Sequence, residues 1–222
     1  MTDDLSPRAA RTAAPVVLDL PFRGRWLARN SPARRVPSHG THLFGTTYAI
    51  DFLAVDERGR SARITWRTAV ATEAPERFVG FGADILAPAT GRVVTAVDGI
   101  ADHVARRSPF PLLRYALGQA GRARVGGTAL AGNHVVIASG DRFVLLAHLQ
   151  HGSVRVRAGD HVASGDPIGR CGNSGNSTQP HVHVQVTDAA DQAQAVGVPM
   201  LFRRPGDAGA WMPAEGEIVD AR

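Results

Sequence analysis

Two histidines, His181 and His183, stand one residue apart in a stretch that alternates polar with apolar side chains. Val182, Val184 and Val186 fill the alternate positions. A period of two predicts a β-strand, in which residues two apart share a face with Cβ atoms roughly 6–7 Å apart. We therefore expect both imidazoles in one site and the valines in the core. Such a pair either binds zinc, divides metal binding and proton transfer between its members, or merely lies on a solvated strand face.

Three further positions offer metal or proton chemistry. Asp51 lies in an apolar run, where a carboxylate costs several kcal/mol unless it is paired or bound to a cation. His148 ends an apolar segment, on the face that alternation assigns to Val144 and Leu146; a hydrogen-bonded core histidine is the simpler alternative there. A loop upstream carries two more histidines, His39 and His42. Catalytic zinc takes three protein ligands and one open position for water, and this chain supplies enough donors.

The only cysteine, Cys171, precedes a small, polar segment with glycines at 172 and 175 that we expect to be a loop. A single cysteine excludes an internal disulfide. We expect it to pack as a small side chain, with a thiolate ligand or nucleophile as the lesser alternative.

Short strands joined by tight turns account for most of the chain. Patterning predicts strands at 16–22, 46–56, 84–97 (two strands with a turn), 134–138, 142–149, 153–156, 161–162, 167–169 and 181–186. Brief strands at regular spacing, together with 24 glycines and 14 prolines, favour a mainly β fold, a small antiparallel β-sandwich or barrel-like sheet. Residues 23–35 read as a connection anchored by Trp26, and the segment after Thr187 as loops packed by Phe202 and Trp211.

The expected domain plan has three parts. An N-terminal extension, partly disordered, covers 1–35; the main domain, which carries the candidate site residues, covers 36–190, with a partly helical insertion at about 101–132; and a C-terminal tail, 191–222, packs on the domain.

Composition bounds the partners. The chain has 222 residues, 44% hydrophobic and 20% charged, as in ordinary globular proteins. Its formal charge is +5, and its arginines are scattered, so we expect no nucleic-acid partner. No apolar run approaches the ~20 residues of a transmembrane helix. The first residues are acidic and carry no readable signal peptide, which predicts a cytoplasmic protein unless it leaves the cell by another route.

Several motifs together resemble one family. The runs Asn133–Ile137, Leu146–Leu149, Val156–Gly169, Gly172–Ser177 and Pro180–His183 strongly resemble the lysostaphin-type zinc metallopeptidases, which are cell-wall endopeptidases with a duplicated hybrid motif fold. The resemblance is dense over 84–98 and 133–186. It implies Zn²⁺ as cofactor, His183 and Asp51 as ligands, and catalytic roles for His148 and His181 beside the metal.

The remaining ligand departs from the family pattern, in which a histidine stands four residues before the aspartate. Thr47 occupies that position here and cannot replace an imidazole. The candidates are His39 and His42, and the Pro-Ser-His-Gly run around His39 resembles divergent members, so His39 is preferred.

The resemblance implies a zinc metalloendopeptidase that hydrolyses peptide bonds in peptidoglycan cross-bridges or stems, with the 172–178 loop bordering a narrow cleft. The alternative is a degenerate relative that binds cell-wall peptides or activates a partner hydrolase. A covalent carrier, suggested by the turn at 156–169, is excluded because the chain has no acceptor lysine. The sequence leaves the oligomeric state undetermined.

Overall fold

The computed structural model describes residues 14–63, 71–106, 130–206 and 209–221. Its elements are β1 (Val16–Leu18), β2 (Gly24–Arg29), the 3-10 helix η1 (Leu43–Tyr48), β3 (Ile50–Ala54), the 3-10 helix η3 (Pro75–Arg77), β4 (Asp84–Leu86), β5 (Gly91–Val97), β6 (Asn133–Ser139), β7 (Arg142–Leu149), β8 (His161–Val162), β9 (Pro167–Arg170), β10 (Val182–Thr187), β11 (Met200–Arg203), β12 (Ala210–Trp211) and β13 (Ile218–Ala221).

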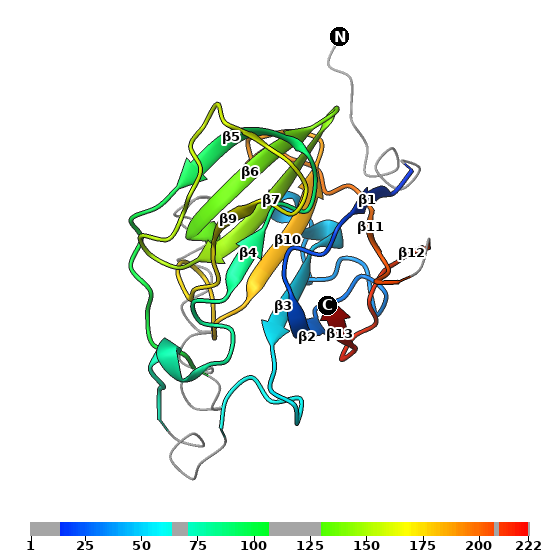
Figure 1. Ribbon diagram of the computed structural model, residues 1–222. Helices are drawn as coiled ribbons and strands as arrows, with labels where there is room; N and C mark the ends of the chain where they lie inside the picture. Colours follow the sequence, from blue (N-terminus) through cyan, green and yellow to red (C-terminus); the bar gives the residue numbers. More distant parts are fainter. Residues whose placement is uncertain (1–13, 64–70, 107–129, 207–208, 222) are drawn as a thin grey trace.

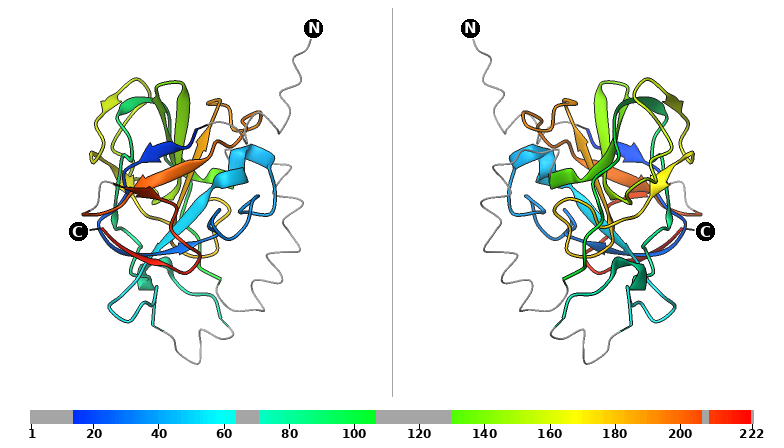
Figure 2. Two further views of the ribbon diagram at one scale, coloured as in Figure 1. Left: turned by 90° about the vertical axis from the view of Figure 1, so that its right-hand side faces the viewer. Right: turned by 90° about the vertical axis from the view of Figure 1, so that its left-hand side faces the viewer.

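An eight-stranded sheet, in the order β13-β2-β3-β10-β7-β6-β5-β8, forms the body of the protein (Figure 1). All its neighbouring strands pair antiparallel. Two small sheets, β1-β11-β12 and β4-β9, accompany it. Figure 2 shows β1 (dark blue) beside β11 (orange), a parallel pair. The expected mainly β, antiparallel class is confirmed.

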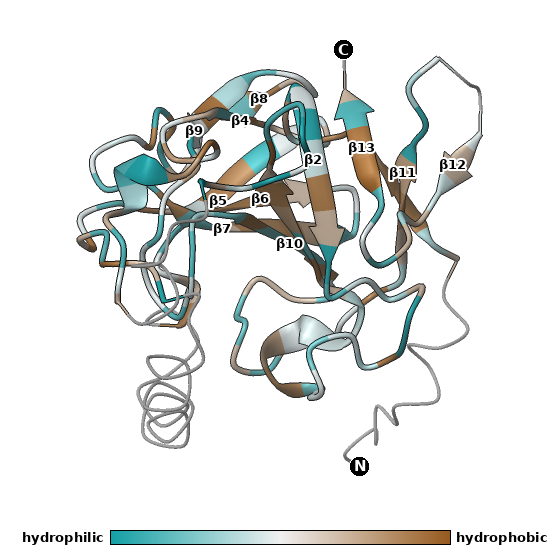
Figure 3. Cartoon of the chain, turned by 90° about the horizontal axis from the view of Figure 1, so that it is seen from below, coloured by the Kyte–Doolittle hydropathy of each residue, from teal (hydrophilic) through white to brown (hydrophobic). Residues whose placement is uncertain are grey.

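One face of the large sheet carries the main core. Val182, Val184 and Val186 of β10 are buried there with Ile50 and Phe52 of β3. Figure 3 shows hydrophobic colouring along the central strands. The alternation that predicted this burial leaves the intervening side chains on the opposite face, among them Asp51 of β3 and His183 of β10.

The sequence analysis expected segment 23–35 to be a connection. The structure shows instead that it contributes β2. Trp26 and Ala28 are buried while Arg25 and Arg29 point outward, so β2 alternates like any half-buried strand. The Trp26 ring stacks on Phe22 with 4.7 Å between centroids. The density of arginines on the outer face masked the period of two.

The strand expected at 46–56 begins only at Ile50. Residues 43–48 form η1 instead, with Phe44 (φ 58°) and Gly45 (φ 73°) in left-handed conformation. A Cβ on Gly45 would lie 2.4 Å from Thr187 Cγ2, so only glycine permits this close approach to β10. Packing against β10 thus overrides the β propensity of Thr46 and Thr47.

The stretch 153–156, expected as a strand, forms none. The Val154 amide donates to the Asp98 carboxylate at 3.2 Å, and the Arg155 amide donates to the Ile168 carbonyl at 3.0 Å. An acidic side chain and a single backbone bond here replace a strand ladder.

The segment after Thr187 is more ordered than the loops expected from its prolines, because it contributes β11, β12 and β13. Phe202 is fully buried against Phe52. β2 and β13 lie outside the expected 36–190 unit yet belong to its sheet; the domain division itself stays a prediction. Most of the expected insertion, 107–129, falls outside the described residues. None of the described helices is both long and apolar enough to cross a membrane.

Candidate metal centre

The polar face of the sheet brings the predicted residues together. His183 of β10 is the direct register partner of Asp51 on β3 and of Ala147 on β7. Adjacent antiparallel partners have Cβ atoms about 4.5–5.5 Å apart, so the pairing places the imidazole beside the carboxylate. Their Nδ1 and Oδ1 atoms are 2.9 Å apart.

His39 completes a group of three potential ligands. Its Nε2 lies 3.2 Å from Asp51 Oδ2, and the ligand atoms of His39, Asp51 and His183 all lie within 4.8 Å of one another. Ligand atoms about 2.0–2.1 Å from a tetrahedral zinc stand roughly 3.3 Å apart. The separation of His39 Nε2 from Asp51 Oδ2 is close to that value, and two imidazole nitrogens with one carboxylate oxygen form a donor set that zinc accepts.

The loop before η1 fixes which nitrogen His39 presents. Ser38 Oγ donates to the Thr46 carbonyl at 3.2 Å and therefore accepts from His39 Nδ1 at 3.0 Å. The hydrogen on Nδ1 leaves the lone pair on Nε2, which faces Asp51. His42 is exposed, bonds Thr47 Oγ1, and lies outside the group.

Asp51 is buried but well supported. Its burial acts to raise the carboxyl pKa, yet His39, His181 and the hydrogen bond with His183 hold that pKa well below its usual value. Asn30 Nδ2 also donates to Asp51 Oδ2 at 2.7 Å. Asn30 was not among the residues predicted from the sequence; it follows β2, whose strand character was missed.

His148 and His181 lie beside this group, with ring centroids 4.6 Å apart. His148 Nδ1 donates to the Ser174 carbonyl at 2.9 Å, and His181 Nδ1 donates to the Gln179 carbonyl at 2.8 Å. Both Nε2 atoms therefore carry lone pairs. Burial lowers the pKa of each ring, that of His148 well below 6.5, so both are neutral proton acceptors at neutral pH.

The position of His148 corrects the sequence analysis, which put it on the face of Val144 and Leu146. Between Leu146 and Leu149 the register with β6 gains one residue, and His148 has φ 64°. This β-bulge turns the ring to the polar face while Leu149 returns to the core. Simple alternation cannot foresee a bulge.

His183 differs from its neighbours. Burial acts to lower its pKa, but hydrogen bonding and charge from Asp51, together with the bond to Gln185, raise it above 6.5. Its Nε2 lies 2.8 Å from Gln185 Oε1. Gln185 was overlooked in the sequence, although it is the next residue on the same face of the strand.

Cys171 takes no part in the site. It is fully buried in the main core, and that burial, with the charge of Asp102, raises the pKa of its thiol. A protonated, enclosed thiol is neither nucleophile nor ligand.

A pocket of about 470 Å³ opens in front of the histidines. Besides the candidate ligands, it is lined by Leu43 and Phe44 from η1, Leu145 from β7, and Asn176 and Thr178 from the glycine-containing loop. The loop at 172–178 thus borders the cleft.

Comparison with known families adds to this geometry. Residues 116–196 match the model described as Peptidase family M23. Over these residues the chain is similar to the M23 peptidases. The match confirms the resemblance to lysostaphin-type peptidases and the enzyme class, metalloendopeptidase. The matched M23 region contains His148, His181 and His183, whereas His39 and Asp51 stand upstream of it.

Solved structures similar to the chain include three M23 proteins. The catalytic domain of the antimicrobial peptidase lysostaphin from Staphylococcus simulans has 16% identity, 86% of this chain and 93% of that chain covered, and a TM-score of 0.39. A mutant of the catalytic domain of the prophage-encoded M23 protein EnpA from Enterococcus faecalis has 19% identity. The match covers 83% of this chain and 89% of that chain, with a TM-score of 0.39. The deep-sea M23 metalloprotease pseudoalterin has 15% identity. The match covers 82% of this chain and 75% of that chain, with a TM-score of 0.42.

Proposed function

We propose that the protein is a zinc-dependent endopeptidase that hydrolyses peptide bonds in the cross-bridges or stems of peptidoglycan. The observation that carries the proposal is the convergence of His39, Asp51 and His183 beside two neutral imidazoles whose Nδ1 atoms are bonded to backbone carbonyls. The peptidoglycan substrate is inferred from the family resemblance.

His39, Asp51 and His183 would hold the ion through Nε2, the carboxylate and Nδ1. Bound zinc lowers the pKa of its water to about 7 and polarises the scissile carbonyl. The chain prepares for it by holding His39 Nε2 and His183 Nδ1 at 3.2 and 2.9 Å from the two oxygens of the Asp51 carboxylate. Asn30 holds that carboxylate in place through Oδ2.

His148 and His181 are assigned the proton chemistry. One neutral imidazole, with its lone pair toward the cleft, would take a proton from the attacking water and pass it to the leaving amine. The other ring would take a proton from solvent before donating to the developing oxyanion. The bonds from Nδ1 to the Ser174 and Gln179 carbonyls prevent either ring from turning away. Burial keeps both uncharged before reaction because it lowers their pKa values.

The cleft fits an extended peptide with small or apolar side chains. Leu43, Phe44 and Leu145 line the cleft with apolar side chains, while Thr178 offers a hydroxyl group to a peptide backbone. Few described lining groups carry charge apart from the candidate ligands themselves.

Digestion of purified peptidoglycan tests this proposal. Zinc-reconstituted protein should release fragments with new amino termini, identified by mass spectrometry, and Asp51→Asn should release none. Absence of zinc from both the purified and the reconstituted protein would refute the enzyme. Bound zinc with intact peptidoglycan, but co-sedimentation of protein and wall, would instead favour a non-cleaving wall-binding relative.

A further inference from the structure

Both ring nitrogens of His183 have partners, and the two partners differ in kind. Nδ1 faces the Asp51 carboxylate at 2.9 Å, while Nε2 faces Gln185 Oε1 at 2.8 Å. A carboxylate accepts a proton or shares a cation, whereas an amide oxygen only accepts hydrogen bonds. The orientation of the Gln185 amide therefore decides whether Nε2 of His183 carries hydrogen.

That orientation is fixed by two acceptors. Gln185 Nε2 lies 2.8 Å from the Phe44 carbonyl and 2.5 Å from Gln192 Oε1. Flipping the amide would bring its oxygen against both oxygens, and buried acceptors cannot face one another without cost. Gln185 Nε2 must therefore face the Phe44 carbonyl and Gln192 Oε1, and Gln185 Oε1 must face Nε2 of His183.

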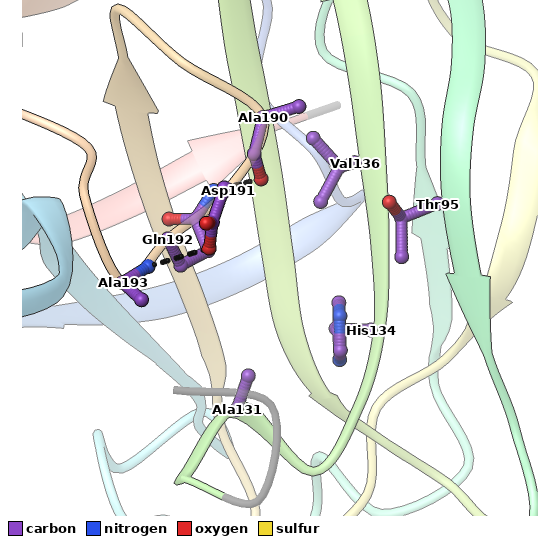
Figure 4. Close-up of a pocket in the computed structure, with 8 residues that line it drawn as sticks. All are labelled: Thr95, Ala131, His134, Val136, Ala190, Asp191, Gln192 and Ala193. Atoms are coloured by element: carbon purple, nitrogen blue, oxygen red, sulfur yellow. Dashed lines mark hydrogen bonds between the residues drawn. The ribbon is translucent and has the colours of Figure 1, made fainter. Parts of the chain in front are cut away.

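Gln192 is held in the same way. Its Nε2 donates to the Ala190 carbonyl at 3.2 Å, which leaves Oε1 free to accept from Gln185. Figure 4 shows Gln192 on the loop after β10, where it lines a second pocket of about 240 Å³. It also lines the cleft of the metal centre, so Gln192 stands between the two pockets.

The Phe44 carbonyl owes its position to the left-handed turn in η1. Phe44 adopts φ 58°, a conformation that non-glycine residues rarely take, followed by Gly45 at φ 73°. A Cβ on Gly45 would lie 3.2 Å from Gln185 Nε2. The turn thus brings a backbone acceptor directly onto the Gln185 amide. Unusual backbone that persists in this way is characteristic of functional sites.

We propose that Gln185, held by Phe44 and Gln192, is a positioning residue that keeps hydrogen on Nε2 of His183 and thereby reserves Nδ1 for the metal. The inference rests on the proposed metal site. Without the amide, the neutral ring is free to carry its hydrogen on Nδ1 and donate it to Asp51, which would close the site with an internal hydrogen bond. Gln185 excludes that arrangement because it would set the Nε2 lone pair against Oε1.

Zinc affinity measured by competition with a chromophoric chelator tests the role. Gln185→Met removes the amide at nearly constant length and should weaken zinc binding about 10–100-fold, as loss of such supporting hydrogen bonds does elsewhere. Gln192→Met removes only the outer acceptor and should weaken it less. Gln194→Met, an exposed amide of the same loop, is the matched control and should bind like the wild type.

Nitrogen-15 NMR of the His183 ring in the zinc-loaded wild type supplies the second readout. We expect a protonated Nε2 and a metal-shifted Nδ1. A protonated Nδ1, or unchanged zinc affinity in folded Gln185→Met and Gln192→Met, would overturn this inference while leaving the metal site intact. A wild-type protein that binds no zinc would overturn the proposed function as well.

Discussion

His183 Nδ1 lies 2.9 Å from Asp51 Oδ1, and the two residues are direct register partners on β10 and β3. The geometry of this pair is therefore set by a backbone ladder and not by a flexible loop. If either strand slipped by one residue in that register, its side chain of the pair would turn into the apolar core. Core packing and the geometry of the candidate metal site are thus specified by the same alternation.

Removal of either central ligand should abolish metal binding. We expect roughly one zinc per chain in the wild type and none in Asp51→Asn or His183→Ala, because each loses one of the three converging ligand atoms. Metal analysis after dialysis measures this, with circular dichroism to verify folding. Stoichiometric zinc in either folded variant would contradict the assignment.

The two loop histidines should behave differently. His39→Ala removes an Nε2 atom that faces Asp51 and should lower zinc affinity strongly, by about tenfold or more. His42→Ala removes an exposed ring bonded to Thr47 and should leave affinity unchanged. Equilibrium titration of both variants side by side gives the comparison; the reverse order would assign the ligand to His42.

His148→Ala should separate catalysis from metal binding. The ring lies beside the candidate ligands without belonging to their group, so zinc content should persist while kcat falls about 10²–10⁴-fold. Turnover of a peptide substrate, normalised to bound zinc, is the measurement. Loss of zinc along with activity would mean that the residue is a ligand.

Acid should destabilise the protein through buried His134. Burial lowers the pKa of this ring below 6.5, against a smaller opposing effect of its bond to the Gly132 carbonyl. Below pH 6.5 the unfolded chain therefore takes up a proton that the folded chain does not. The free energy of unfolding should fall as pH drops from 6.5 to the folded-state pKa.

Denaturant titrations at a series of pH values test this. His134→Gln removes the titrating group and should give a shallower pH dependence over the same window. Identical slopes for variant and wild type would show that His134 does not contribute.

Gly45→Ala should be more harmful than Gly140→Ala. Both glycines have positive φ, so both substitutions carry the cost of about 1 kcal/mol for a left-handed alanine. A Cβ at 140 meets nothing within 4 Å, whereas one at 45 would overlap Thr187. We expect Gly45→Ala to lose roughly 1–3 kcal/mol more, measured by chemical denaturation. Equal losses would mean that the turn relaxes freely.

Alternation in the sequence was sufficient to predict that His181 and His183 share a face, but it put His148 on the wrong face. His181 and His183 lie together, the intervening valines are buried, and Asp51 is buried with cationic or polar partners around it. These features follow from local periodicity and from the cost of burying a charge, both of which can be read without knowledge of distant contacts.

Other features depend on tertiary contacts that no local pattern encodes. The bulge at His148 depends on pairing between β6 and β7, and η1 replaces a strand because Gly45 packs against Thr187. β2 was hidden by its outward arginines and becomes a strand through pairing with β3 and β13. Asn30 and Gln185 could be recognised only once Asp51 and His183 had positions in space.

The pairing of β13 with β2, and of β2 with β3, has a practical consequence for protein production. A trimmed version that starts after Arg29 would bare the edge of β3, the strand that bears Asp51. Unprotected strand edges recruit other chains, so such a product should self-associate and precipitate in place of yielding a smaller enzyme. An affinity tag should therefore be added beyond either end of the chain, and should not replace β2 or β13.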